Sequence, residues 1–524
     1  MRTADSDVAV PPAHPTHRLA AGALAVGVVG AGTALAVGAF RTRDSAEPLP
    51  PTTRTLLTAD LPLHLARRAT YGLTPTLLAD IVATGPSEWL EQQLDPGRVD
   101  DSVIDGLLAA YPLLTHDAAQ LQRLLGDAAD RRLAGEQLVE ATLARQIWSK
   151  RQLFEVMVDF WSNHFNVTTP LGPTYATKPV EDATVIRRHA LGRFEDLLLA
   201  DAQSPAMLIH LGNADSRGDD PNENYGRELL ELHTVGVDGG YTEDDVRDSA
   251  LTLTGWSVGQ DGKFAFDPAG HYVGRVQVLS WSAPNDRAED GQAVGADYLR
   301  YLARHEQTAL HLSRKLAVRF VSDEPPAALV KRLAATFLAH DTQVVPWLRE
   351  LFSSPEFAAA TGQKVRRPLE DIVASVRALG IGPPKASDTS GIAALVGRAG
   401  GLGQAPLGAA PPTGYPDVAA AWLSSSSVLG RWNVHRLLTA GGFTGLVYPG
   451  LRALTRTAEP RTNGELVDRI AELLTGQRFR AEHRAALLEF LVTTEDAEYD
   501  EAALLGQLPD LTALVLDSPY HLLR

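Results

Sequence analysis

The spacing of apolar and polar residues predicts a chain built mainly of helices. Apolar positions recur every three to four residues over long stretches, which is the pattern of helices that bury one face. These stretches cover residues 61–68, 74–94, 120–165, 185–211, 221–236, 242–256, 296–320, 326–340, 344–352, 368–379 and most of the chain from 418 onward. We therefore expect a mainly α fold: a large multi-helix domain with irregular loop insertions and at most a few short strands.

Two segments lose this periodicity. Residues 257–295 are rich in Gly, Pro, Asp and Ser, and residues 381–416 are rich in Gly, Ala and Pro. Within the first segment, 264–266 and 276–279 have the composition of short strands. We divide the chain into a leader with a Pro-rich linker (1–55), an N-terminal helical half (56–260), an irregular insertion (261–300) and a C-terminal helical half (301–524).

The leader contains an apolar span long enough to cross a bilayer. It runs without a charge from Leu19 to Phe40, directly after Arg18. Ala34-Leu35-Ala36 offers a small-x-small cleavage site, so a cleaved signal peptide and an uncleaved membrane anchor both fit. In either case we expect the body of the protein outside the cytoplasmic membrane, anchored or secreted, with membrane contact only through residues 19–40.

Composition excludes several classes of function. The formal net charge is −16, whereas a nucleic-acid-binding protein needs a basic footprint, so we expect no nucleic-acid partner. The chain has no cysteine, which excludes disulfides, thiolate metal sites, iron–sulfur clusters and a cysteine nucleophile. At 524 residues the chain can bury a large core.

The run at 221–236, Pro-Asn-Glu-Asn-Tyr-Gly-Arg-Glu-Leu-Leu-Glu-Leu-His-Thr-Val-Gly, concentrates the most chemistry in the chain. Asp220 can cap a helix that has Pro221 at its first position, and Gly236 can end it. At 100° per residue, Asn224, Glu228 and Glu231 form a polar stripe, with Arg227 at its edge. His233 lies near the predicted C-terminal end.

A second helix repeats this design. Glu155, Asp159 and Asn163 share a polar stripe, and His164 lies opposite among apolar neighbours. We expect the helices that carry Asp159 and Glu228 to be direct neighbours. If their stripes face each other, four carboxylates converge and need arginines or a metal ion as counter-charges.

Three interpretations of these residues remain open. Glu228 and Glu231 could supply acid/base catalysis, with Asp159 and His164 completing the site and Arg227 tuning pKa values or binding an anion. A divalent metal ion could instead be bound, with ligands Glu228, Glu231, Asp159 and His233. The third interpretation is a buried Arg–carboxylate network that ties helices together.

Several separated motifs, in order, resemble a known family. They are Asp-Phe-Trp-Ser-Asn-His-Phe at 159–165, Ala-Leu-Gly-Arg-Phe at 190–194, the run at 221–236 and Leu-Thr-Gly-Trp at 253–256. Together they resemble the bacterial domain-of-unknown-function family 1800, from about Leu63 to the C-terminus. The family has no established activity, so the resemblance implies no substrate. The family pattern near His271 is similar to His-Asp, but Tyr272 follows here, which argues against a His–Asp pair.

Two further segments resemble family motifs. Residues 364–370, Lys-Val-Arg-Arg-Pro-Leu-Glu, could start a helix with a solvated basic face or bind an anion. Residues 412–416, Pro-Thr-Gly-Tyr-Pro, together with Trp422, could form an aromatic wall for a sugar or peptide, or could pack the two halves together. His305 and His311 are six residues apart, about 120° off one helical face, so we expect no shared metal ion.

We expect an exported protein that is a carboxylate- or metal-dependent hydrolase of an envelope or extracellular polymer. The alternative is a non-catalytic cell-envelope structural or interaction protein with a buried Arg–carboxylate network. Either function would have a protein or polymer partner in the envelope. A carboxylate cluster that opens onto a cleft favours the enzyme, and a sealed, arginine-paired cluster favours the alternative.

Overall fold

The computed structural model describes residues 56–170, 172–450 and 460–524. The predicted leader, with its apolar span at 19–40, lies outside the described residues. No helix in the described part of the chain is both long enough and apolar enough to span a membrane. Residues Arg54–Arg524 form one compact unit.

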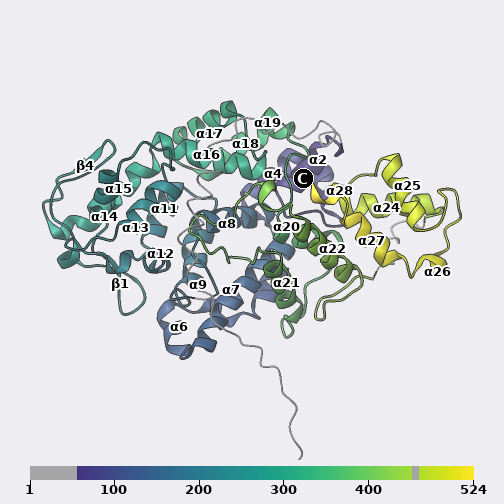
Figure 1. Ribbon diagram of the computed structural model, residues 1–524, viewed down its shortest axis with the longest axis horizontal. Helices are drawn as coiled ribbons and strands as arrows, with labels where there is room; N and C mark the ends of the chain where they lie inside the picture. Colours follow the sequence, from purple (N-terminus) through teal and green to yellow (C-terminus); the bar gives the residue numbers. More distant parts are fainter. Residues whose placement is uncertain (1–55, 171, 451–459) are drawn as a thin grey trace, which may run out of the picture. The chain divides into compact units, whose positions relative to one another are not determined.

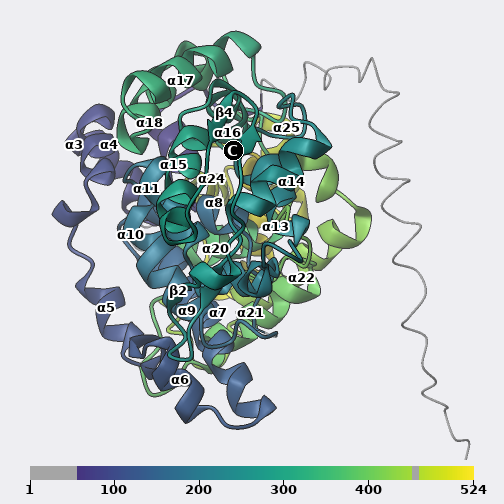
Figure 2. The same ribbon diagram turned by 90° about the vertical axis from the view of Figure 1, so that its left-hand side faces the viewer.

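The expected mainly α fold is confirmed (Figures 1 and 2). The first part of the unit contains α2 (Leu61–Arg68), α3 (Leu77–Thr84), α4 (Pro86–Leu94), α5 (Ser102–Leu108), α6 (Ala118–Leu124), α7 (Ala128–Trp148), α8 (Gln152–His164), α9 (Lys178–Glu181), α10 (Arg187–His189), α11 (Phe194–Ala202), α12 (Pro205–His210), α13 (Glu223–Glu228) and α14 (Glu243–Thr252). The second part contains α15 (Gly291–Ala303), α16 (Glu306–Phe320), α17 (Ala327–Ala339), α18 (Val344–Ser353), α19 (Pro355–Ala358), α20 (Pro368–Ala378), α21 (Ser390–Gly401), α22 (Ser425–Thr439), α24 (Asn463–Thr475), α25 (Ala481–Phe490), α26 (Glu501–Leu504), α27 (Leu508–Leu516) and α28 (Pro519–Leu522).

The irregular segment at 257–295 forms two small antiparallel sheets. β1 (Trp256–Val258) pairs with β2 (Phe264–Phe266), with Trp256 opposite Phe266. β3 (Val276–Val278) pairs with β4 (Trp281–Ala283). The two predicted strands are therefore confirmed, and each acquires a partner that the sequence pattern did not indicate.

The long helical stretch predicted at 120–165 is interrupted twice, between α6 and α7 at 125–127 and between α7 and α8 at 149–151. The second break has a visible cause. Asp101 accepts hydrogen bonds from the Lys150 backbone N–H and the Ser149 hydroxyl, both at 2.7 Å. Because a remote carboxylate satisfies this backbone donor, the chain can turn there without leaving it unpaired. Helical periodicity alone could not indicate this break.

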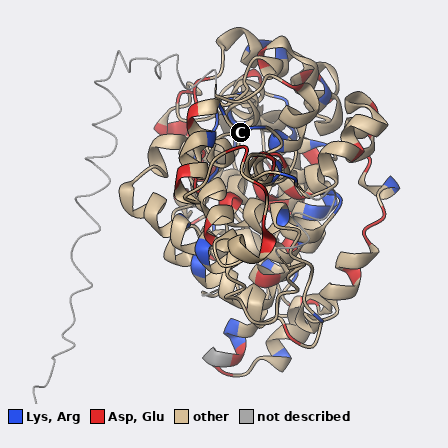
Figure 3. Cartoon of the chain, turned by 90° about the vertical axis from the view of Figure 1, so that its right-hand side faces the viewer, with Lys and Arg blue, Asp and Glu red and all other residues tan. Residues whose placement is uncertain are grey.

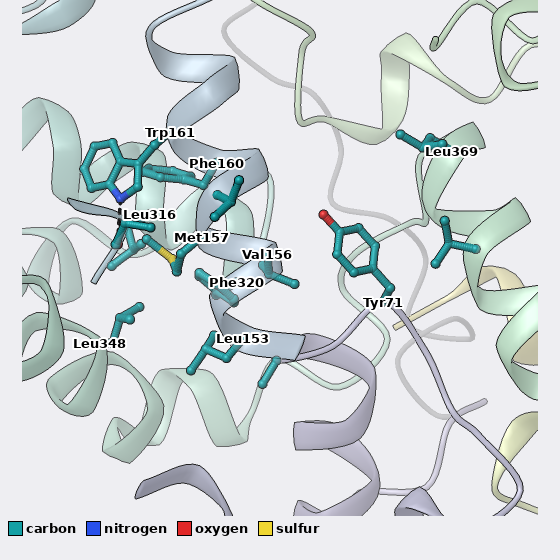
Figure 4. Close-up of a cluster of buried hydrophobic side chains, with 14 of the residues drawn as sticks. Tyr71, Leu153, Val156, Met157, Phe160, Trp161, Leu316, Phe320, Leu348 and Leu369 are labelled. Atoms are coloured by element: carbon teal, nitrogen blue, oxygen red, sulfur yellow. Dashed lines mark hydrogen bonds between the residues drawn. The ribbon is translucent and has the colours of Figure 1, made fainter. Parts of the chain in front are cut away.

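α8 lies in the apolar core (Figure 4). Its side chains Met157 and Trp161 are buried on the side of Leu316 from α16 and Leu348 from α18, and Val156 is buried on the side of Tyr71. The Trp161 indole N–H donates to the backbone carbonyl of Ala190 at 3.0 Å, which joins the 159–165 motif to the 190–194 motif. Burial on this scale supplies most of the energy that holds such helices together.

The helix of the 221–236 run begins later than predicted and changes its form. Asn222, not Asp220, is the N-cap, and its side chain accepts from the Asn224 backbone N–H. Asp220 is instead held in a tight turn with Arg217, which explains the shift. After Glu228 the chain continues as a π-helical turn, η5 (Leu229–His233). The turn ends at His233 with Thr234 as its C-cap, three residues before the expected stop at Gly236. Gly236 has a φ of +83°, and its backbone N–H donates to the Leu230 carbonyl at 2.9 Å.

Charged residues of both signs are interspersed over the face drawn in Figure 3. The excess of acidic residues is therefore not gathered into one block on that face. The residues that could carry chemistry lie instead in and beside a pocket, described next.

Candidate functional site

Side chains from separate family motifs line one pocket of about 440 Å³. The lining comes from α8, from the residues after Gly236, from α16, from the N-cap of α20 and from the 413–417 loop. Its members are Asp159, Phe160, Asn163, Val237, Asp238, His311, Arg314, Lys315, Val318, Arg319, Arg367, Thr413, Tyr415, Pro416 and Asp417. Motifs more than 250 residues apart in sequence thus contribute to one concave surface, which is the usual setting of a small-molecule site.

The 413–417 loop is fastened to α8. The Asn163 side-chain amide donates to the Tyr415 carbonyl at 2.9 Å, and the Tyr415 backbone N–H donates to Asn163 Oδ1 at 2.6 Å. Gly414 has a φ of +70°, and a Cβ there would lie 2.3 Å from the Asn163 carbonyl oxygen. The Thr-Gly-Tyr sequence therefore suits this loop, because glycine permits the close approach that brings Tyr415 to the pocket wall.

Lys315 on α16 contacts His164 at the C-terminal end of α8. The Lys315 Nζ lies 2.7 Å from His164 Nδ1, and His164 Nε2 lies 3.1 Å from the His233 carbonyl oxygen. Burial, with the Lys315 charge, lowers the pKa of His164 well below its ordinary value, so the imidazole is neutral. Its Nε2–H therefore donates to the carbonyl, and its Nδ1 accepts from Lys315.

Burial lowers the pKa of Lys315 to about 8. The surrounding histidines are neutral as well: burial followed by the Lys315 charge lowers the pKa of His233 to about 3 and that of His311 to about 4. The ring centroids of His233 and His311 lie 5.9 Å and 6.4 Å from that of His164. The pocket wall thus holds an amine that can exchange a proton near neutral pH.

Asp159 enters a buried ion-pair network. Its Oδ2 lies 2.7 Å from Arg367 Nη2, and Arg367 also contacts Glu370 at 3.1 Å. Glu370 contacts Arg319 too, and lies 3.3 Å from Arg524 Nη1. Burial favours the neutral form of Glu370, but the three arginines lower its pKa well below the ordinary range.

This network corrects the expectation of a solvated basic face at 364–370. Lys364, Arg366 and Arg367 are between 1% and 4% exposed. Each guanidinium or ammonium has oxygen partners: Lys364 Nζ, for example, lies 2.6 Å from Asp323 Oδ1. The motif is therefore a buried helix start, and Arg367 is the member that reaches the pocket.

Glu155, the other carboxylate of α8, is sealed away. It receives two hydrogen bonds from Arg187, at 3.0 Å and 2.9 Å, and Arg187 also donates to Asp182 at 3.0 Å. Glu155 and Asp182 are both buried. This pairing satisfies the third interpretation, a structural Arg–carboxylate network, at this position.

The carboxylates of the 221–236 run have different surroundings. Arg227 pairs with Glu243 through two hydrogen bonds, at 2.9 Å and 2.6 Å, and lies 3.8 Å from Glu231. Burial and the neighbouring Glu231 raise the pKa of Glu228, which is half-buried. The Arg227 side chain is 33% exposed, so this group is near the surface.

The expected convergence of four carboxylates is wrong. Glu155 pairs with Arg187 and Asp159 with Arg367, whereas Glu228 and Glu231 share Arg227, so each stripe has its own arginine. Among the described residues these carboxylates do not form one cluster. The two elements meet at their C-terminal ends instead, where His164 donates to the His233 carbonyl. The reason is packing: the 223–228 helix lies against α14, where Glu243 supplies the partner of Arg227.

The proposed metal ligands are consequently not gathered. Asp159 faces Arg367, Glu231 faces Arg227, and the His233 ring packs against Phe165 with centroids 5.0 Å apart. His271 is bound by Thr254 and Asn285, at 2.8 Å and 2.9 Å, which agrees with the argument against a His–Asp pair.

Lys315 was missed by sequence reasoning. It lies in an amphipathic stretch, Leu-Ser-Arg-Lys-Leu at 312–316, in which nothing distinguishes it from a solvated lysine. The only available signal was its position four residues after His311, which places the two on one helical face.

A comparison with protein-family models identifies the family of this chain. It belongs to the family described as "Protein of unknown function (DUF1800)", whose model matches residues 64–523. The comparisons with curated proteins and with solved structures found no match.

Proposed function

We propose that this member of the DUF1800 family is an exported hydrolase of an envelope or extracellular polymer, with its active site in the Lys315 pocket. The observation that carries the proposal is the contact between Lys315 and neutral His164 in the wall of a pocket where separate motifs meet. Perturbed pKa values in a pocket favour a functional site over a purely structural one.

In this proposal Lys315 transfers the proton. With a pKa of about 8, its neutral form can take a proton from an attacking water and return it to the leaving group. His164 orients the amine, because its Nε2–H is fixed on the His233 carbonyl and its Nδ1 must therefore accept from Lys315. This is the arrangement of a base positioned by a second group.

The other lining residues would bind the substrate. Arg314 is exposed at the pocket and can attract an anionic group or a developing oxyanion. Tyr415 offers an aromatic surface of the kind that sugars and peptides contact, and Asp159 is held in place by Arg367. Glu228 and Glu231 have no part in this pocket, so their acid/base role is not carried over into the proposal.

The experiment compares hydrolysis by the wild type, Lys315→Met and Lys331→Met. Lys331 is an exposed lysine on α17 and serves as the matched control. Release of soluble fragments from isolated cell envelopes, polysaccharides and proteins is measured by chromatography. We expect the wild type and Lys331→Met to release the same products, and Lys315→Met to be slower by roughly 100-fold or more. Equal rates for Lys315→Met and the wild type would contradict the proposal.

Export forms a separate part of the proposal. It is supported by the uncharged span from Leu19 to Phe40 behind Arg18. A reporter enzyme that works only outside the cytoplasmic membrane is fused after Arg43, and we expect this fusion to be active. An inactive fusion would exclude export.

The non-catalytic alternative is favoured by a specific observation. The carboxylates Glu155 and Glu370 are buried and fully engaged by arginines, as in a network that only holds helices together. If the wild type hydrolyses none of the envelope, polysaccharide or protein substrates, and Lys315→Met leaves its envelope binding unchanged, this alternative replaces the enzyme.

A further inference from the structure

Three metal-ligating side chains converge in the core, apart from the Lys315 pocket. Asp371 lies in the first turn of α20, His435 in α22 and His521 in α28. They are 1%, 2% and 3% exposed. One ligand atom of each lies within 4.8 Å of the others. His435 and His521 thus meet Asp371 in the core, although they lie 64 and 150 positions after it in the sequence.

The spacing of these atoms suits one small cation. His435 Nε2 lies 3.0 Å from Asp371 Oδ2, and His521 Nε2 lies 3.5 Å from Asp371 Oδ1. Ligands about 2.0–2.1 Å from a tetrahedral Zn²⁺ are separated from each other by roughly 3.3 Å. Both imidazoles present the same nitrogen toward the carboxylate, as ligands of a shared ion would. We propose that Asp371, His435 and His521 bind a divalent transition-metal ion, with Zn²⁺ as the first choice.

The outer contacts support the proposal independently. His435 Nδ1 lies 2.7 Å from Asp517 Oδ1, at the C-cap of α27. A ligating histidine normally donates its second ring N–H to such a carboxylate, which leaves Nε2 free to hold the metal. The Ser375 hydroxyl donates to the Asp371 backbone carbonyl at 2.8 Å and lies 3.1 Å from His521 Nε2, so it borders the cluster, and a water would be the fourth ligand.

The charge balance also permits a dication. Asp371 and Asp517 carry two negative charges, and the histidines are neutral when they bind a metal. Two guanidinium groups lie nearby: Arg366 donates to the His521 carbonyl and Arg431 to the Arg366 carbonyl, both at 2.8 Å. Their charges also act on Asp371 and oppose a dication, and the two carboxylates offset them. In the competing arrangement no metal is bound, and a doubly protonated His435 donates one ring N–H to Asp371 and the other to Asp517.

The ion would be structural, because the cluster is sealed from solvent. It would fasten α20, α22 and α28 together, and α20 carries Glu370 beside Asp371. Glu370 holds Arg367 and Arg319, two residues of the pocket wall. Metal binding therefore supports the wall of the proposed active site, although the inference itself does not depend on any activity.

The test measures metal in the purified full chain. Mass-spectrometric elemental analysis is expected to find about one Zn²⁺ per wild-type chain, or one bound after titration of chelator-treated protein with ZnCl₂. His521→Gln is expected to lose at least 10-fold in affinity. His340→Gln, at an exposed histidine on the end of α17, is the matched control and is expected to bind like the wild type.

A spectroscopic measurement on the wild type keeps the inference testable if the variant fails to fold. Co²⁺ added to chelator-treated protein is expected to give the visible absorption of a four-coordinate site with nitrogen and oxygen ligands, and Zn²⁺ is expected to displace it. A wild type that binds neither ion would overturn the inference and favour the doubly protonated His435. Unchanged binding by folded His521→Gln would overturn it as well.

Discussion

α8 and the helix at 223–228 have nearly the same polar pattern, yet they occupy opposite environments. In α8, Glu155 is buried against Arg187, and Asp159 is fixed by Arg367 at the wall of the pocket. In the second helix, Arg227 and Glu243 pair near the surface, and Glu228 lies between the opposing charges of Glu231 and Arg227, with burial and Glu231 prevailing to raise its pKa. The same stripe of acids thus has a structural role in one helix and a superficial one in the other, because burial and partners decide the role.

The largest expected effect is a loss of stability when the buried Glu155–Arg187 pair of α8 is altered. Glu155→Gln keeps the side-chain shape but leaves Arg187 with one carboxylate partner in the core. We expect the free energy of unfolding to fall by roughly 1.5–3 kcal/mol, because charge-assisted hydrogen bonds between buried groups are weakened while Asp182 still balances the Arg187 charge. Urea denaturation of the variant measures it. A loss below about 1 kcal/mol would mean that the Glu155 pair is not a structural anchor.

The second prediction concerns the pH dependence of stability that comes from the buried histidines between α8 and the 221–236 run. The pKa of His233 is lowered to about 3 in the folded protein, whereas an unfolded histidine has a pKa of about 6.5. The unfolded state therefore gains a proton below pH 6.5 that the folded state does not, and stability falls as pH falls. Between pH 7.5 and 5.5 the contribution of His233 is a loss of about 1.4 kcal/mol.

This prediction is measured as a difference between variants, because other groups titrate in the same window. The loss on acidification should be smaller by about 1.4 kcal/mol in His233→Asn than in the wild type. His311→Asn should behave in the same way, since burial lowers the pKa of His311 to about 4. Identical pH profiles for wild type and both variants would show that these histidines are not held neutral.

The third prediction separates activity from stability at Lys315. At pH 7 the folded protein holds a protonated amine whose pKa burial has lowered to about 8, which costs stability. Lys315→Met removes that cost and loses one hydrogen bond to His164. We expect a net gain of about 1 kcal/mol in thermal melts together with the loss of hydrolysis. A strongly destabilised variant would assign Lys315 a structural role instead.

The smallest effect on stability is expected for the carboxylates of the 221–236 run. Burial and Glu231 raise the pKa of Glu228, so folding disfavours its charged form, and stability rises as the pH falls through that pKa. Glu228→Gln should therefore change stability by less than about 0.5 kcal/mol, in the favourable direction. Glu231→Gln is the companion variant, because Arg227 keeps Glu243. If either variant loses more than about 2 kcal/mol of stability, the residue belongs to a structural charge network after all.

The sequence by itself determined the helices, several of their ends and the motifs that matter. The helix at 61–68 has its predicted bounds, and Thr242 and Asp245 form the expected capping pair. These features depend on local periodicity and local hydrogen bonds, which a short window of sequence contains. The motifs at 159–165 and 412–416 were also identified from the sequence, and both reach the pocket.

Only the tertiary structure decided which polar groups meet. Asp159 pairs with Arg367, 208 residues away, and Lys315 meets His164, 151 residues away. Desolvation and long-range pairing set the pKa of each group, and neither is encoded in the spacing of one helix. The same physics gathers Asp371, His435 and His521 from three helices, a cluster that no local pattern indicates. The chain therefore specifies its elements locally and its chemistry through packing.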